Sequence, residues 1–138
     1  MTYTDPAAIA AIRDAIRSEQ NYVFACGLVG AQLKGGARRR AVNQLADRRQ
    51  RIEVLAAMID QTQVPSTPPG FEPPAPIDNA RSARRALVDL NNSLVGTYAQ
   101  VAATTEGDDR ALAVASAQDC ARTAVQWGGA SQAFPTAE

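Results

Sequence analysis

Apolar side chains recur along this chain at alternating steps of three and four residues in four separate segments. This spacing places them on one face of an α-helix and is typical of helices that pack against each other. It predicts helices over about residues 5–34, 37–62, 78–105 and 108–127. The 138 residues are enough for one domain with a real core. We therefore predict an all-α fold in which residues 1–138 form a single four-helix bundle.

Residues suited to helix ends separate these segments. Gly35 and Gly36 accept the left-handed conformation that ends a helix, and the short gap makes the first two helices an antiparallel pair. Asp5, Asp78 and Asp108 are the expected N-terminal caps of the first, third and fourth helices. The second pair of helices is therefore also expected to be an antiparallel hairpin.

A proline-rich segment, residues 63–77, joins the two hairpins. Its six prolines exclude helix and sheet interior. An extended run of this length reaches roughly 40 Å, and a helix of about 25 residues is roughly 37 Å long. We predict a crossover along the whole bundle, with Phe71 and Ile77 as apolar anchors. The alternatives are a loop that bulges locally or a boundary between two separate hairpins.

Charged and amide side chains interrupt the predicted core. Glu19, Arg48 and Asp119 lie in the middle of three apolar stripes, and Arg51 follows Arg48 by one turn. On the third helix, either Asn91 or its neighbour faces inward. Isolated buried charges cost several kcal/mol unless they are paired, and the planar fork of arginine bridges carboxylates well. We predict a buried polar network of these five residues; the alternative is that the charges reach solvent at the edge of a rotated stripe.

The fourth helix and the chain after it complete the expected core. The inward-facing stripe of this helix is predicted to comprise Leu112, Ala115, Asp119, Arg122 and Val125. We expect the aromatic side chains of Trp127 and Phe134 to pack onto the end of the bundle.

Composition narrows the possible chemistry. The chain has no histidine, which excludes histidine bases, Ser-His-Asp and Cys-His sites, and histidine-bound metals. Fourteen basic residues balance fourteen acidic ones, so no overall field favours nucleic acid or an anionic membrane. Neither a signal peptide nor an apolar run of roughly 20 residues is visible, and we expect a cytoplasmic protein. Cys26 and Cys120 are expected to be free, buried thiols.

Several motifs together resemble a family of small actinobacterial ferritin-like domains of unknown function. They are Glu19-Gln20-Asn21-Tyr22 in the first helix, Ala46-Asp47-Arg48-Arg49-Gln50-Arg51 in the second, Tyr98 with 101–105 in the third, and the closing Gln126-Trp127-Gly128-Gly129 with Phe134-Pro135. The resemblance covers nearly the whole chain and implies a ferritin-like four-helix bundle.

Ferritin-like enzymes hold two metals with a Glu on each of two helices and a Glu-x-x-His motif on each of the other two. Only Glu19 matches that pattern, and Arg48 or Arg51 faces it where a ligand would be needed. Arginine cannot ligate a cation. We therefore expect no metal and no cofactor. If a metal did bind, its ligands would come from Glu19, Asp47, Glu53 and Asp119.

The leading functional hypothesis is that the chain is a non-catalytic structural or interaction protein. We expect it to form a homo-oligomer, preferably a dimer, and an unidentified protein partner is a further possibility. The alternative is a carboxylate-only metal site or a residual oxidoreductase. Two further hypotheses stay open: an acidic partner bound by Arg38-Arg39-Arg40, and a small-molecule pocket beside Gly27, Gly30 and Ala31.

Overall fold

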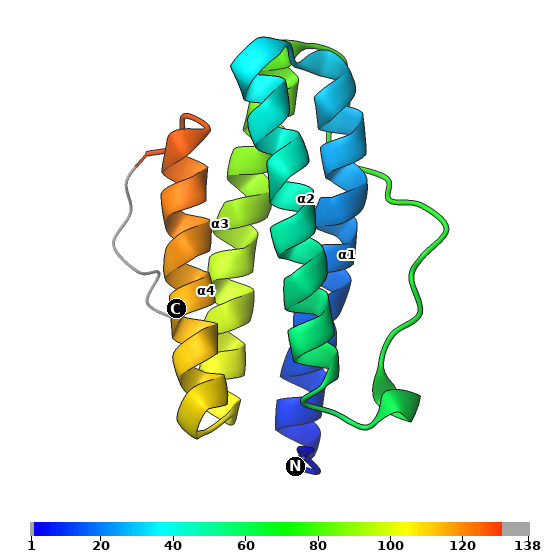
Figure 1. Ribbon diagram of the computed structural model, residues 1–138, viewed down its shortest axis with the longest axis vertical. Helices are drawn as coiled ribbons and strands as arrows, with labels where there is room; N and C mark the ends of the chain where they lie inside the picture. Colours follow the sequence, from blue (N-terminus) through cyan, green and yellow to red (C-terminus); the bar gives the residue numbers. More distant parts are fainter. Residues whose placement is uncertain (1, 131–138) are drawn as a thin grey trace.

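The computed structural model describes residues 2–130 and is built from four long helices (Figure 1). They are α1 (Pro6–Gln32), α2 (Gly35–Ala56), α3 (Ala80–Thr104) and α4 (Gly107–Gln126), and a short 3-10 helix, η1 (Gln61–Gln63), follows α2. The described residues include no strand. The predicted all-α four-helix bundle is confirmed.

The connection between the hairpins determines the topology. In Figure 1, α1 and α2 run in opposite directions, the proline-rich segment returns along the bundle, and α3 then runs parallel to α2. Hydrogen bonds follow this return along α1, because Arg13 Nη1 donates to Gln63 Oε1 at 3.1 Å and Gln20 Nε2 to the Pro65 carbonyl at 3.3 Å. The predicted crossover is confirmed, and the proline-rich segment does not form the local bulge that was the alternative.

The two predicted anchors of the crossover are both half-buried. Ile77 packs against the core, and Phe71 lines a small apolar cavity between the crossover and α3. Phe24 of α1 also supports the segment, since its ring lies next to Gly70. The crossover is thus attached to both α1 and α3.

Helix boundaries differ from the prediction around α2. The helix ends at Ala56 and not near residue 62, because the chain turns there and buries Met58 and Ile59. The Tyr3 N–H donates to the Met58 carbonyl at 2.9 Å, which attaches the N-terminal residues to this turn. Gly35 has φ +57°, so it supplies the expected left-handed residue, but it does so at the start of α2.

The expected N-terminal caps were only partly correct. Asp5 occupies the N-cap position of α1 without a side-chain hydrogen bond, and Asp108 lies inside the first turn of α4. Asn79, not Asp78, caps α3. Asn79 Oδ1 accepts from the Ser82 N–H at 2.7 Å, and Ser82 Oγ accepts from the Asn79 N–H at 3.1 Å, which forms a capping box.

The predicted stripe of α4 was wrong by a rotation about the helix axis. Ala115 and Arg122 are exposed, Val125 is 45 % exposed, and Leu112 and Asp119 are only half-buried. Small side chains face the bundle because they let α4 pack closely against α3, whereas the prediction favoured the larger apolar side chains. The buried residues are Ala113, Ser116, Ala117, Cys120, Thr123 and Ala124.

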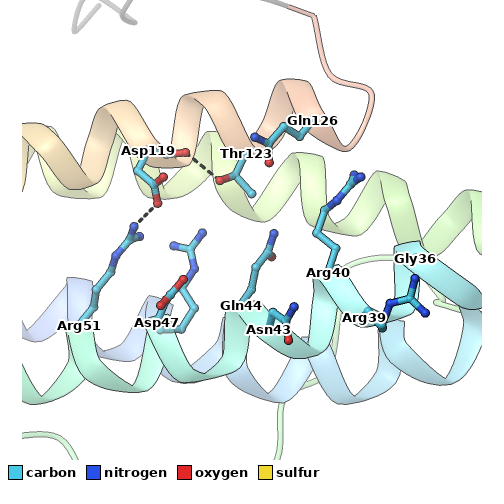
Figure 2. A pocket seen from close by; sticks show the side chains of 11 residues that line it. Gly36, Arg39, Arg40, Asn43, Gln44, Asp47, Arg51, Asp119, Thr123 and Gln126 are labelled. Carbon is cyan, nitrogen blue, oxygen red and sulfur yellow. Dashed lines mark hydrogen bonds and ion pairs between the residues drawn. The ribbon is translucent and has the colours of Figure 1, made fainter.

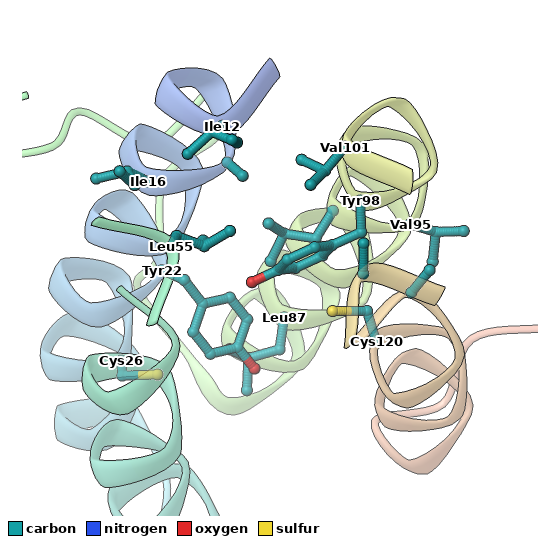
Figure 3. Close-up of a cluster of buried hydrophobic side chains, with 14 of the residues drawn as sticks. Ile12, Ile16, Tyr22, Cys26, Leu55, Leu87, Val95, Tyr98, Val101 and Cys120 are labelled. Atoms are coloured by element: carbon teal, nitrogen blue, oxygen red, sulfur yellow. The ribbon is translucent and has the colours of Figure 1, made fainter. Parts of the chain in front are cut away.

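Aliphatic side chains from the helices fill most of the core (Figure 3). Leu55 of α2 packs with side chains of the other helices, and each fully buried aliphatic side chain contributes about 1.5–3 kcal/mol. In α1 the alternating spacing predicts Val23 on the apolar face, but Tyr22 is fully buried and Val23 only half-buried. The labelled aliphatic residues of Figure 3 are Ile12, Ile16, Leu55, Leu87, Val95 and Val101.

Trp127 covers one end of the bundle, as predicted, and is 2 % exposed. The guanidinium groups of Arg40 and Arg84 lie 5.3 and 5.5 Å from the centre of its ring, so α2 and α3 both contribute to its site. Phe134, the other residue expected here, lies outside the described residues. No helix among residues 2–130 is long and apolar enough to cross a membrane.

The turn after α4 generates a first prediction. A Cβ at Gly129 would lie 2.9 Å from the Ala124 carbonyl oxygen and 2.9 Å from Val88 Cγ1. We expect Gly129→Ala to lower the free energy of unfolding by about 1–3 kcal/mol in urea denaturation, because backbone or Val88 must shift. Gly96→Ala is the control: its Cβ meets open space, so it should be neutral or stabilising. Equal effects of the two changes would contradict this account of Gly129.

Candidate functional site

An ion pair between α1 and α2 occupies the centre of the bundle. Glu19 is 0 % exposed and Arg48 is 2 % exposed. Arg48 Nη1 donates to Glu19 Oε1 at 3.1 Å and to Oε2 at 3.4 Å. The prediction that both charges are buried and paired therefore agrees with the structure.

Asn91 connects this pair to α3. Arg48 Nη2 donates to Asn91 Oδ1 at 2.7 Å. The amide nitrogen of Asn91 donates to the Leu87 carbonyl at 2.8 Å and to the Tyr22 hydroxyl at 3.0 Å. Asn91 is completely buried and Asn92 only half-buried, so Asn91 is the inward-facing member of the two.

Two tyrosines complete the coordination of the charges. The Tyr98 hydroxyl donates to Glu19 Oε2 at 2.6 Å. The Arg48 guanidinium lies 4.1 Å from the centre of the Tyr22 ring, and the Tyr22 hydroxyl donates to Gln44 Oε1 at 2.5 Å. Burial raises the pKa of both hydroxyls above their ordinary value. Both tyrosines are therefore neutral hydrogen-bond donors near pH 7.

Arg51 and Asp119 lie at the edge of this layer. Arg51 Nη1 is 3.6 Å from Glu19 Oε2, and Arg51 Nη2 pairs with Asp119 Oδ2 (Figure 2). Asp119 is 44 % exposed, so it closes the network at the surface and is not the core residue that the sequence indicated. Arg122 approaches the same carboxylate at 4.0 Å. Within the layer, Arg48 and Arg51 thus balance Glu19 and Asp119, while Arg122 approaches Asp119 from the exposed side of α4.

The pKa of Arg48 reflects two opposing effects, its burial and its pairing with charged neighbours. Burial has the largest single effect and lowers the pKa of its guanidinium, but the Glu19 carboxylate, together with Cys120 and Tyr22, more than offsets burial, and the pKa is raised. Arg48 therefore keeps its charge at every pH at which the protein folds. The interaction holds because both partners are present: removal of one would leave the other buried without a counter-charge.

Cys120 extends the network on α4. Its Sγ accepts from Arg48 Nη1 at 3.3 Å and from Arg51 Nη1 at 3.6 Å. Burial raises the pKa of the Cys120 thiol, and it raises the pKa of Cys26 to about 12. Both cysteines are free and buried, as predicted. Figure 3 shows them on opposite sides of Tyr22.

The remaining candidate metal ligands lie away from this layer. Asp47 and Glu53 are exposed on α2. Within residues 2–130, no group of three Cys, Asp or Glu side chains is placed to hold a metal ion together. The Arg48 and Arg51 guanidinium groups lie against Glu19 instead.

Sequence analysis missed four members of the network: Tyr22, Gln44, Tyr98 as a hydrogen-bond donor, and Cys120. Helical spacing carried a signal for the first two. Tyr22 lies three residues after Glu19, and Gln44 lies four residues before Arg48, so each shares a helix face with a predicted member. No comparable signal marked Cys120, because α4 was assigned the wrong face.

Comparison with known proteins agrees with this architecture. A family model described as a domain of unknown function, DUF4439, matches residues 11–138. The chain belongs to this family. The DUF4439 chain is also similar to the crystal structure of a conserved hypothetical protein from Mycobacterium tuberculosis, with 25 % identity over 90 % of this chain and 97 % of that chain, and a TM-score of 0.81. No curated protein matches it. The resemblance to a family of unknown function is thus confirmed.

The central ion pair of this DUF4439 chain generates a second prediction. Arg48→Ala should lower the free energy of unfolding by about 3–5 kcal/mol, because Glu19 stays buried without its main partner. The double change Glu19→Gln with Arg48→Ala should cost less than the two single changes added together, because it removes both charges. Chemical denaturation of the four proteins measures this coupling.

Arg49→Ala is the matched control for the same helix. Arg49 is exposed, and its removal should change the free energy of unfolding by no more than about 0.5 kcal/mol. Additive single and double changes, or an Arg48→Ala cost no larger than that of Arg49→Ala, would show that the central pair is not the coupled unit described here.

Proposed function

We propose that this chain is a non-catalytic structural or interaction protein with a ferritin-like bundle, in which arginine has taken the place of metal. The observation that carries the proposal is the direct contact of Arg48 with both oxygens of Glu19. Glu19 is the one residue that matches the ligand pattern of ferritin-like enzymes. A guanidinium supplies positive charge there but has no lone pair with which to ligate or activate anything.

The protonation behaviour of the layer supports a non-catalytic role. General acid–base catalysis needs a group that exchanges a proton near the working pH. The pKa of Tyr22, Tyr98 and Cys120 is raised by burial, so all three stay protonated, and Arg48 stays charged. These four groups therefore do not exchange a proton near pH 7. The free thiols also fit the cytoplasmic location that belongs to the same proposal.

Metal analysis provides the third prediction. The purified protein, incubated anaerobically with excess Fe(II) or Mn(II) and freed of unbound metal by gel filtration, should retain far less than one metal ion per chain. Neither metal should raise the melting temperature. The reason is that Arg48 and Arg51 would repel a cation placed beside Glu19.

The alternative, a carboxylate-only metal site or residual oxidoreductase, predicts that the purified protein retains metal in the same experiment. One or more metal ions per chain, lost in Glu19→Gln but kept in Glu72→Gln, would establish that alternative and overturn the proposal. Glu72 is a suitable control because it is an exposed carboxylate of the proline-rich segment and is not one of the four candidate ligands.

We further propose that the protein acts as a homo-oligomer, preferably a dimer, formed through α4. Val114 and Val125 are 42 % and 45 % exposed. Eleven residues are about three turns, so both side chains lie on one side of the helix. Gln118 and Ala121 lie between the two valines on this side of the helix, and we propose that a second copy covers this mixed strip.

The mass in solution is the fourth prediction. Light scattering during gel filtration should give twice the 14.6 kDa of one chain. Val114→Asp with Val125→Asp should shift the protein to a monomer, because two carboxylates would be buried without partners. Val42→Asp, at an exposed valine of α2, should leave the dimer intact. A wild-type mass of 14.6 kDa at all concentrations would end this part of the proposal.

A further inference from the structure

A polar cleft separates α2 from α4. The other neighbouring helices pack directly, α1 against α2 and α3, and α3 against α4. Between α2 and α4 a space of about 500 Å³ remains open (Figure 2), which is within the range of small-molecule sites. Its lining residues are Gly36, Arg39, Arg40, Asn43, Gln44, Asp47, Arg48, Arg51, Asp119, Thr123 and Gln126.

The cleft carries an excess of positive charge. Its lining includes four arginines and two carboxylates, and Glu19 pairs with Arg48 from the interior, which leaves an excess of one positive charge. Arg48 and Arg51 are engaged with Glu19 and Asp119. Arg39 and Arg40, in contrast, are exposed and form no ion pair with a carboxylate of residues 2–130. The unneutralised charge is therefore concentrated at the end of the cleft near the start of α2.

The first turn of α2 strengthens the positive potential at this end. No side chain caps the helix, and its first turn contains no acidic residue. Arginines here oppose the helix dipole, which costs a few tenths of a kcal/mol each. Arg39 also lies close to Gly36, since its Nη2 is 3.7 Å from the position that a Gly36 Cβ would occupy. An anion bound here would offset both unfavourable terms.

A directed chain of hydrogen bonds leads from the buried layer to the cleft. Arg48 donates to Asn91, Asn91 donates to Tyr22, and the Tyr22 hydroxyl donates to Gln44 Oε1. Because the Gln44 oxygen is taken by Tyr22, its amide nitrogen is left as a donor. Figure 2 shows the Gln44 side chain pointing from α2 toward α4, into the cleft. The buried hydrogen-bond chain thus orients the Gln44 amide as a neutral donor in the cleft that Arg39 and Arg40 also line.

From these features we infer that the cleft binds a small phosphate-bearing molecule. Arg39 and Arg40 bind the phosphate, since the guanidinium fork matches phosphate oxygens. Asn43 and Gln44 contact the uncharged part of the ligand, and the Asp47 carboxylate accepts from a ligand hydroxyl farther along. This site needs neither metal nor catalysis, so it is independent of the function proposed above. It also differs from the acidic-partner hypothesis, because Arg38 does not line the cleft.

Binding of three probes to the full chain tests the inference: inorganic phosphate, glucose 6-phosphate and AMP, each by calorimetry at low ionic strength. At least one organic phosphate should bind more tightly than inorganic phosphate, because only it reaches Gln44 and Asp47. Arg39→Gln with Arg40→Gln should weaken that binding at least tenfold. If the double variant unfolds because Arg40 also contacts Trp127, the single variant Arg39→Gln should still weaken binding severalfold.

Arg38→Gln is the matched control, since it removes the same charge from an exposed neighbour outside the cleft. Wild-type affinity for the organic phosphate in Arg38→Gln would support the cleft. Three results would overturn the inference: no binding of any probe at millimolar concentration, equal weakening in Arg38→Gln and Arg39→Gln, or binding of inorganic phosphate only, which would indicate an adventitious ion.

Discussion

The Glu19–Arg48 ion pair is the constraint on which the arrangement of the four helices depends. A buried carboxylate or guanidinium is costly alone, so the position of each fixes the position of the other. Asn91 extends the constraint to α3, and Arg51 with Asp119 extends it to α4. A slip of one helical turn, about 5.4 Å, would leave these groups without partners. Aliphatic contacts alone tolerate such shifts better, which gives this polar layer a role in specifying register.

The crossover is a consequence of the same layer. Arg48 lies near the middle of α2 and Asn91 near the middle of α3, and these helices run parallel (Figure 1). A short connection would make α3 antiparallel to α2 and would place different faces toward Glu19. The proline-rich segment returns the chain to the starting end of α2, with hydrogen bonds to Arg13 and Gln20 on the way. Its stiffness limits the entropy lost when it is fixed along α1.

Most of the fold could be predicted from sequence because helix period, glycine turns and prolines are local signals. The four helices, the crossover, and the burial of Glu19, Arg48 and Asn91 followed from them. The rotation of α4 could not be predicted, since a helix rich in alanine has no distinct apolar face until its neighbours are known. Asp119 was therefore placed in the core although it is 44 % exposed, and the contacts of Cys120, one residue on, with Arg48 and Arg51 were missed, although its burial was predicted.

The arginines of α2 fall into two groups that differ in their surroundings although they share one helix. Arg48 and Arg51 lie against Glu19 and are neutralised within the fold, whereas Arg39 and Arg40 face the cleft without carboxylate partners. The first group places its positive charge beside Glu19 at the centre of the bundle. The second leaves positive charge at the surface of the same cleft, about two turns away along α2. Since arginine stays charged at all physiological pH values, the protein side of this cleft has no proton switch, and its attraction for an anion depends on geometry and ionic strength.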